Sequence, residues 1–317
     1  FFFGFISIPP MLLGVILSAY STFGIEAKFG FNRTTVGIFL RDRLVGLLLG
    51  IVLGSLVLGM LLLFLESAGD YGWLKAWAAL AAFQIFLSFV APVVILPLFN
   101  RYTPLPEGEL KTAMQKYAAQ QGFSLAGIFV MDGSKRSNKA NAFFTGFGRF
   151  RRLVLFDTLI EKLSAEEIIA VVAHEVGHFR LHHILFGLAS SLFTSAVGLW
   201  VAQALIVRPE LSAALGLDAI SLYSGLAALS LLSGPLLRPF SALSHAVSRK
   251  FEYDADRFAA TTLGRSDTLA DGLRKMGSDH LAQLDPHPLR VWLDYTHPPL
   301  PARLQRLRSS SMLRATS

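Results

Sequence analysis

The sequence predicts a mainly α-helical, polytopic transmembrane protein with a water-facing domain that contains a small β-sheet. Of its 317 residues, 53% are hydrophobic and only 16% are charged, which exceeds the apolar share of an ordinary soluble domain. The apolar residues gather in five blocks of about 20 residues, the length that a helix needs to cross a bilayer. A polar segment with short β-like runs separates the third block from the fourth, and this segment predicts the sheet.

The five expected membrane spans cover about 1–23, 43–65, 76–98, 184–207 and 217–237. Pro9 and Pro10 kink the first one, which packed neighbours make tolerable in a membrane helix. The last two are rich in Gly, Ala and Ser, the residues that helix–helix contacts in lipid favour. The chain opens on Phe1 without a basic leader segment, so we expect no signal peptide. We expect instead that it starts within a span and that upstream sequence is missing.

The distribution of basic residues predicts the sidedness. If all five blocks cross, residues 24–42, 99–183 and 238–317 share one side, and 66–75 and 208–216 share the other. Of the 29 Lys and Arg residues, only Lys75 and Arg208 fall on the second side, so the first side is expected to be cytoplasmic. A topology in which one hairpin does not span remains open. The net charge of +7 comes without an aromatic-interleaved basic patch, so we expect the lipid bilayer, and no nucleic acid, as a partner.

Residues 99–183 read as a folded domain outside the membrane. Lys111–Gln121 predicts a helix ended by Gly122, and Ile128–Met131 and Leu153–Phe156 predict short strands. Between the strands, Asn141–Gly148 reads as a further strand ending in glycines. It is either one side of a small hairpin with a buried aromatic face or an edge strand that pairs with an extended peptide substrate. The residues alone leave both interpretations open.

The most informative motif is His174-Glu175-Val176-Gly177-His178. The apolar run before it and the preceding Ser164-Ala165-Glu166-Glu167, an N-cap with a reciprocal glutamate, predict a helix. Two histidines four residues apart share one helix face and can reach one zinc ion, while Glu175 stands beside the open metal position as general base. The chain contains no cysteine, so any metal must be bound by His, Asp or Glu.

A third ligand is expected from the polar segment after the fifth block. Glu252 and Asp256 lie four residues apart and share a helix face. Taken alone, this spacing is more typical of a solvated acidic helix face than of a metal site. Together with the two histidines, Glu252 completes a His₂Glu catalytic zinc site, and Asp256 accepts the free N–H of a ligand histidine.

The remaining histidines carry no such signal. His297 lies in a proline-rich turn before a basic amphipathic helix, where a lone histidine is an ordinary surface residue unless something else points to it. We assign no functional role from the sequence to the other five, which are His182, His183, His245, His280 and His287.

These motifs, in this order, resemble the type I CaaX prenyl proteases, integral-membrane zinc endopeptidases of the gluzincin group. The resemblance covers nearly the whole chain. It rests on residues 26–33, 131–137 and 141–146, on 174–178, on 248–256 and on 297–299. Members of that family look like seven-span helical proteins that enclose a large chamber with a zinc site at its cytoplasmic end. Five spans here imply that the first two are absent from this chain.

The resemblance implies a function and further site residues. It implies that His174, His178 and Glu252 bind one zinc ion per chain and that Glu175 is the base. It adds Asn141 and Ala142 as contacts to the substrate backbone, and His297 as a donor near the tetrahedral intermediate. It also implies cleavage after the prenylated cysteine of CaaX proteins, at the cytoplasmic face of a bacterial inner membrane or of the endoplasmic reticulum.

The resulting domain organisation has four segments. Residues 1–98 hold three membrane helices, 99–183 the metalloprotease domain with the His174–His178 helix, 184–237 two further membrane helices, and 238–317 the rest of the catalytic domain with the third ligand. Two competing functions stay open. One is a membrane-protein quality-control protease related to the heat-shock-induced zinc proteases. The other is a channel or transporter with a structural metal, against which the free Glu175 argues.

Overall fold

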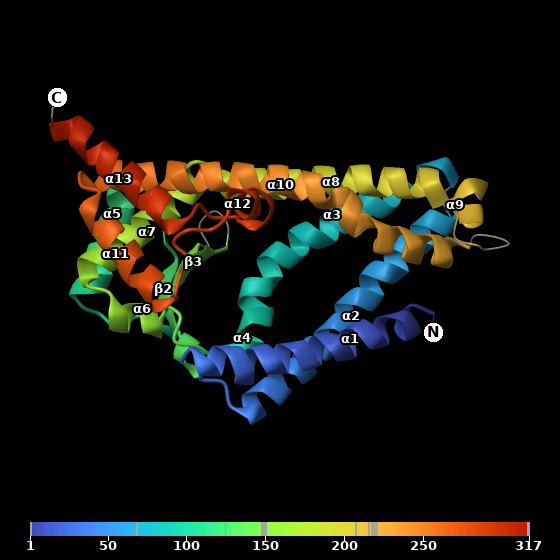
Figure 1. The fold of residues 1–317 in the computed structure, drawn as a ribbon, viewed down its shortest axis with the longest axis horizontal. Coiled ribbons are helices and arrows are strands. Elements are labelled where there is room, and N and C mark those ends of the chain that lie inside the picture. Colours follow the sequence, from blue (N-terminus) through green and yellow to red (C-terminus); the bar gives the residue numbers. More distant parts are fainter. Residues whose placement is uncertain are drawn as a thin grey trace. The chain divides into compact units, whose positions relative to one another are not determined.

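The computed structural model of the chain describes residues 2–67, 69–123, 125–146, 151–206, 208–214, 216 and 221–315 (Figure 1). It separates into two compact units, which are considered one at a time. The first comprises Phe1–Ala91 and Phe186–Leu237, and the second comprises Pro92–Leu185 and Arg238–Ser317. Residues 1, 207 and 217–220 of the expected spans, and 147–148 of the expected third strand, lie outside the described residues.

The first unit is built from membrane helices. Within the described residues, five helices are long and apolar enough to cross a membrane: Phe3–Glu26, Val36–Glu66, Gly69–Phe99, His183–Ile206 and Leu222–Leu263. Large apolar side chains such as Phe193 and Leu231 are more than two-thirds exposed on them, at 71% and 74%. Contact of such side chains with lipid is favourable, whereas their contact with water is not. The fold class expected from the sequence, a mainly helical polytopic membrane protein with a small sheet, is confirmed.

The helical elements of this unit are α1 (Phe2–Ala19), α2 (Val36–Ser67), α3 (Gly72–Val90), α8 (His183–Ile206), α9 (Pro209–Ala214) and the start of α10 (Leu222–Leu263). Gln203 of α8 ties α8 to the N-terminus of α3. Its Nε2 donates to the carbonyls of Gly69 and Asp70, each at 3.1 Å, and its Oε1 accepts from the Trp73 N–H. A membrane helix thus supplies a partner for backbone groups that lipid could not satisfy.

Helix α10 extends beyond the apolar block from which it was expected. The fifth expected span ends at 237, whereas α10 continues to Leu263. No glycine or proline interrupts residues 240–263, and Gly264, with φ of +71°, ends the helix. Hydropathy marks where a helix can leave lipid and does not mark where the helix ends. The same helix therefore carries a membrane segment and, further along, Glu252 and Asp256.

The second unit contains a four-stranded sheet in the order β1-β2-β4-β3. Its strands are β1 (Tyr102–Pro104), β2 (Gly127–Met131), β3 (Ala142–Thr145) and β4 (Arg152–Phe156). β2 and β4 run parallel, while β1 pairs with β2, and β3 with β4, in antiparallel fashion. The strands predicted at Ile128–Met131 and Leu153–Phe156 are thus confirmed. β3 is an edge strand, because its other side has no partner strand among the described residues.

Helices of this unit share one apolar core with the sheet (Figure 1). They are α5 (Glu109–Gln120), α6 (Asp157–Lys162), α7 (Ala165–Arg180), α11 (Asp267–Asp279) and α13 (Leu300–Ala315). The unit also contains the short helices α4 (Leu96–Phe99) and α12 (Pro288–Asp294), which have no buried residues. The core includes Met114, Leu153, Leu155, Leu159, Ile168, Val172, Val176 and Leu269, all almost fully buried. Helix α7 lies in the middle of this core and contacts α5, α11 and β3. Its position is therefore held from several sides.

The N-terminus of α7 is fixed by the capping box that the sequence predicts. Ser164 Oγ accepts from the Glu167 N–H at 3.3 Å, and Glu167 Oε2 accepts from the Ser164 N–H at 2.8 Å. Lys275 of α11 lies 2.7 Å from Glu167 Oε1. Burial by itself raises the pKa of Glu167, but the hydrogen bonds from Lys275 and Ser164 outweigh burial and hold that pKa below its ordinary value.

This depressed pKa predicts an acid-dependent contribution to stability. A carboxyl whose folded-state pKa lies below its unfolded value stabilises the fold above the unfolded pKa of about 4.3, and the contribution disappears as pH falls through the folded pKa. We expect Glu167→Gln to lower the thermal unfolding midpoint at pH 7 and to narrow its difference from the parent chain as pH drops below 4.5. Melting curves of both chains in one detergent between pH 3 and 7 measure this. Parallel curves at all pH values would contradict it.

Candidate active site

Helix α7 presents two imidazoles to one point. His174 is buried and His178 half-buried, and their Nε2 atoms lie 3.2 Å apart. The rings meet edge to face, with centroids 4.8 Å apart. Residues four apart on a helix lie on the same face, so the four-residue spacing is what brings both nitrogens to one place.

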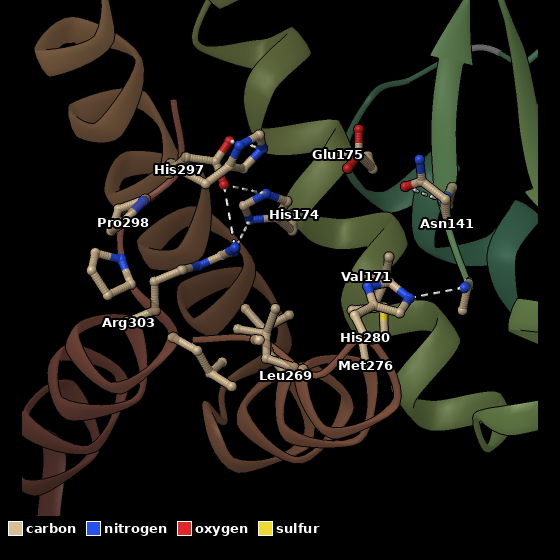
Figure 2. Close-up of a pocket in the computed structure, with 18 of the residues that line it drawn as sticks. Asn141, Val171, His174, Glu175, Leu269, Met276, His280, His297, Pro298 and Arg303 are labelled. Atoms are coloured by element: carbon tan, nitrogen blue, oxygen red, sulfur yellow. Dashed lines mark hydrogen bonds and ion pairs between the residues drawn. The ribbon is translucent and has the colours of Figure 1, made fainter. Parts of the chain in front are cut away.

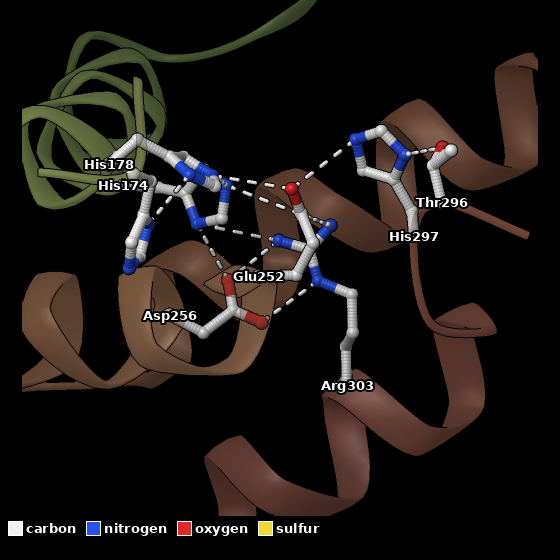
Figure 3. Close-up of polar contacts among 8 residues, drawn as sticks. His174, His178, Glu252, Asp256, Thr296, His297 and Arg303 are labelled. Atoms are coloured by element: carbon white, nitrogen blue, oxygen red, sulfur yellow. Dashed lines mark hydrogen bonds and ion pairs between the residues drawn. The ribbon is translucent and has the colours of Figure 1, made fainter. Parts of the chain in front are cut away.

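Helix α10 brings a carboxylate to the same point. Glu252 Oε1 lies 3.2 Å from His178 Nε2, and Glu252 Oε2 lies 3.5 Å from His174 Nε2. Figure 3 shows the Glu252 side chain facing the two imidazoles from the opposite helix. The structure therefore brings together the three residues that sequence analysis expected to bind a metal, although they are drawn from helices far apart in the chain.

The geometry of these three residues fits one zinc ion. One ligand atom from each can be chosen so that all lie within 4.8 Å of one another. Atoms bound at 2.0–2.1 Å to one tetrahedral zinc lie about 3.3–3.4 Å from each other, close to the spacings found here. Glu252 Oε2 is also buried, and within the described residues it accepts no hydrogen bond of good geometry, although Arg303 Nη1 and His174 Nε2 lie 3.3 Å and 3.5 Å away. Two histidines with one carboxylate leave a position for water, as in catalytic sites.

Asp256 and Arg303 form polar contacts with the side chains of this cluster. Asp256 Oδ1 lies 2.8 Å from His174 Nδ1. Arg303 of α13 donates to both Asp256 oxygens, from Nε at 2.8 Å and Nη2 at 2.6 Å, and its Nη1 lies 3.3 Å from Glu252 Oε2. Arg303 is 8% exposed, so this is a buried guanidinium that bridges two carboxylates (Figure 3). Arg303 was not predicted from the sequence. The only sequence signal for it was that two acidic groups on one helix face require a positively charged partner.

The surroundings of His174 are electrically negative. Burial by itself lowers the pKa of this imidazole, but hydrogen bonds to Asp256 and Glu252 outweigh burial and raise the pKa to about 9. The same excess of negative charge is what a divalent cation needs from its site. It argues for a metal centre over a solvated acidic face.

Close packing of α7 on α10 makes these distances attainable. A Cβ atom placed on Gly177 would lie 3.1 Å from the Ala255 Cα, 3.2 Å from the Ala255 carbonyl oxygen and 3.2 Å from the Phe258 Cβ. Ala255 itself is fully buried. Two helix backbones can approach this closely only where both contact residues are small. The absence of a side chain at Gly177, within the His174–His178 motif, therefore allows the short distance between α7 and α10.

A cavity of about 590 Å³ opens beside the cluster. It is lined by the three clustered residues and by Glu175, Asn141 and Ala142, among others. Figure 2 shows Glu175 on α7 between His174 and Asn141 in that view. Burial raises the pKa of the Glu175 carboxyl above its ordinary value, which is the direction that suits a general base. Among the described residues, none forms a hydrogen bond with this carboxylate.

The other sequence-predicted residues also lie at this cavity. His297 Nε2 is 3.3 Å from Glu252 Oε1, and its Nδ1 is 2.9 Å from Thr296 Oγ1.

Asn141 and Ala142 lie at the start of β3. The Phe156 N–H donates to the Asn141 carbonyl at 3.0 Å, so the alternation of an antiparallel ladder turns the N–H and C=O of Ala142 away from β4. The outward edge of β3 thus faces away from its partner strand.

His280 anchors the segment before β3. Its Nε2 accepts from the Ala140 N–H at 3.0 Å (Figure 2), and His280 lines the same cavity. Burial, followed by the nearby Lys162 and Lys139, lowers the pKa of this imidazole, which suits an acceptor. No sequence pattern predicts this contact, because residues 140 and 280 meet only through the fold.

Comparison with known proteins identifies the class to which this fold and site belong. Residues 104–311 match the family described as "Peptidase family M48". Residues 1–101 match the family described as "CAAX prenyl protease N-terminal, five membrane helices". The first match covers β2, β3, β4 and every residue of the metal cluster, and the second covers the first three membrane helices. The chain belongs to peptidase family M48 and is a membrane-embedded metallopeptidase.

Individual relatives agree with this assignment over most of their length. The chain is 36% identical over 294 residues to CAAX prenyl protease 1 homolog of Oryza sativa subsp. japonica, covering 92% of this chain and 69% of the relative. It is 33% identical over 341 residues to the human homolog, covering 94% and 71%. The crystal structure of S. mikatae Ste24p matches with a TM-score of 0.90 and 32% identity, covering 96% of this chain and 74% of that one. The family that the sequence motifs resemble is thereby confirmed, and a peptidase is favoured over a channel with a structural metal.

The packing at Gly177 gives a prediction for the site. We expect Gly177→Ala to weaken zinc binding and to lower the thermal unfolding midpoint, because the added methyl group meets backbone atoms of α10 that cannot move independently. An alanine normally stabilises a helix by about 0.5–1 kcal/mol relative to glycine, so the sign is diagnostic. Chelator competition and melting curves measure both effects.

The matched control is Gly187→Ala in α8, where an added Cβ meets nothing within 4 Å. This variant should equal or slightly exceed the parent chain in stability. A Gly177→Ala chain as stable as the parent, with unchanged zinc affinity, would refute the role of this contact.

Proposed function

We propose that this chain is a zinc-dependent endopeptidase that removes the C-terminal residues of prenylated CaaX proteins at the cytoplasmic face of its membrane. The observation that supports this most strongly is the convergence of His174, His178 and Glu252 on one point beside a cavity. Glu175 lines the same cavity without belonging to that cluster. Three ligands with a nearby free carboxylate are the arrangement of a hydrolytic zinc site.

In this proposal His174, His178 and Glu252 hold one zinc ion per chain, and Asp256 orients His174 by accepting the hydrogen on its Nδ1. Zinc, when bound, acidifies water and polarises the scissile carbonyl. Arg303 keeps Asp256 and Glu252 ionised by compensating their charge. The position of His174 is thus set by two contacts, one at each ring nitrogen.

Glu175 is the proposed general base. Its carboxylate takes a proton from the attacking water and delivers that proton to the amine that leaves. A raised pKa suits both steps, since the group must bind the proton and then release it. The Glu175 side chain is also free of other hydrogen bonds within the described residues, so its proton-transfer geometry is not committed elsewhere.

Asn141, Ala142 and His297 are proposed to hold the substrate. The outward N–H and C=O of Ala142 offer main-chain hydrogen bonds to an extended peptide, which would add a strand to the edge of the sheet. Asn141 Oδ1 at present accepts from the Ala142 N–H at 2.9 Å, so this amide can move aside or contact the peptide itself. His297, with Nε2 directed at the cluster, donates to the oxyanion of the tetrahedral intermediate.

The substrate class is supported by the relatives. Those compared are named as CAAX prenyl proteases, and their similarity extends through the membrane helices as well as through the catalytic unit. The competing function, a quality-control protease for membrane proteins, uses the same chemistry on unprenylated chains. An assay that offers both substrates separates the two functions.

We expect the detergent-purified chain to cleave a farnesylated CaaX peptide after the prenylcysteine. Glu175→Gln should lose about 10²–10⁴-fold in kcat while keeping its zinc, because only the proton transfer is removed. Turnover and zinc content of both chains, with and without a zinc chelator, are the measurements. Chelator-sensitive cleavage of an unprenylated unfolded protein, without cleavage of the peptide, would assign the chain to quality control. Near-parental turnover by Glu175→Gln would contradict the base assignment.

The cytoplasmic orientation is proposed from charge. All but two of the 29 Lys and Arg residues fall in the segments assigned to one side or at their edges, and short loops rich in such residues stay in the cytoplasm. Residues 24–42, between the first two membrane helices, carry Lys28, Arg33 and Arg41. The catalytic unit belongs to this side.

Because the chain has no cysteine, single-cysteine variants report sidedness directly. Gln115 of α5 and Ala213 of α9 are both exposed. We expect a membrane-impermeant maleimide to label Ala213→Cys in intact cells and to label Gln115→Cys only after permeabilisation. Labelling of Gln115→Cys in intact cells would invert the proposed orientation.

A further inference from the structure

A histidine outside the expected site contacts one of the clustered imidazoles. His183 Nδ1 lies 3.1 Å from His178 Nδ1. His183 is 9% exposed and is the first residue of α8. No motif in the sequence selected it, and the proposed mechanism does not use it.

The chain bends sharply to make this contact. Helix α7 ends at Arg180, and His182 adopts a left-handed conformation with φ of +61°. The His182 N–H donates to the Phe179 carbonyl at 3.0 Å, which closes the turn. Left-handed backbone is uncommon for residues other than glycine, although His, Asn and Asp adopt it more often than most. The bend places His183 against His178, five residues earlier in the chain.

The His183 ring is also held by α10. It stacks on Phe251 with a centroid distance of 3.9 Å and an interplanar angle of 9°. Phe251 precedes Glu252 directly. Stacking on Phe251 of α10 therefore fixes the plane of the His183 ring. The backbone at the start of α8 fixes the direction of the ring, so that its Nδ1 faces His178.

Hydrogen placement then follows from valence. His178 Nε2 faces Glu252 and His174, so this nitrogen must carry the lone pair when a metal binds, and Nδ1 must carry the hydrogen. The partner of that hydrogen is His183 Nδ1, which must accept. A ligand histidine usually donates its second N–H to a carboxylate, a carbonyl or water, as His174 does to Asp256. In His178 a second imidazole occupies that place.

We propose that His183 is a positioning residue that fixes the tautomer and ring direction of His178 by accepting its Nδ1–H. This inference rests on the proposed zinc site. His183 acts only through His178 and touches neither metal nor substrate. Removing the acceptor leaves a half-buried N–H unpaired and frees the imidazole to rotate, so the expected effect is weaker zinc binding.

Two substitutions separate the hydrogen bond from the packing. His183→Phe keeps a flat ring against Phe251 but has no acceptor. His183→Asn loses the ring, and its Oδ1 takes the place of the imidazole Nδ1. If the hydrogen bond matters, His183→Phe weakens zinc affinity by about 10–100-fold, as is typical for such partners, while His183→Asn stays within about threefold of the parent chain.

The measurement is zinc affinity of the detergent-purified full chain by competition with a chelator, with melting curves as a check on folding. His182→Asn is the matched control, because it removes the adjacent exposed imidazole and keeps a residue that tolerates left-handed backbone. It should bind zinc like the parent. If His183→Phe does not fold, His183→Leu supplies the acceptor-free comparison.

Unchanged zinc affinity in the acceptor-free variant would overturn the inference, because the hydrogen bond would then have no effect on zinc binding. An equal loss of zinc affinity in His183→Asn would also overturn it, because the loss would then come from packing of the ring. A parent chain that binds no zinc would overturn the proposed function together with this inference. A parent that binds zinc, with variants that do not follow the predicted order, would overturn only the role of His183.

Discussion

The close approach of α7 and α10 at Gly177 and Ala255 is the constraint on which the site depends. The two helices supply every member of the metal cluster, and each contributes one face that holds two of its polar residues, four apart. Because the spacing between ligand atoms is near 3.2–3.5 Å, a displacement of a few tenths of an ångström would disturb the site. The surrounding core, with α5, α11 and the sheet against α7, keeps that helix in place.

Charge balance is the second condition. Glu175, Glu252 and Asp256 carry three negative charges when all are ionised, within a buried region of the protein. Arg303 supplies one positive charge through contacts to two of these carboxylates, and a divalent ion supplies two. Buried charges are tolerated only when they are paired in this way. The cluster, its guanidinium and a bound divalent ion would therefore form one electrostatic unit, and the left-handed turn at His182 attaches a further imidazole to the cluster.

Much of the fold and of the site could be predicted from the sequence, and there is a physical reason why the rest could not. Helix periodicity places His174 with His178, and Glu252 with Asp256, on common faces, and the chemistry of zinc then joins the two pairs. Arg303, His183 and His280 escaped because their partners lie far away in the chain or across a backbone bend that no periodic pattern announces. The extension of α10 beyond 237 escaped for a different reason, since hydropathy locates lipid and not the end of a helix.

The central claim is that His174, His178 and Glu252 bind one zinc ion with room for water. X-ray absorption at the zinc edge, together with metal analysis of the purified chain, tests it most directly. The account predicts one zinc per chain in a shell of four nitrogen and oxygen ligands at about 2.0–2.1 Å, including two imidazoles. It predicts loss of that shell in Glu252→Ala. An active chain without metal, or a zinc shell that is unchanged in Glu252→Ala, would contradict the account.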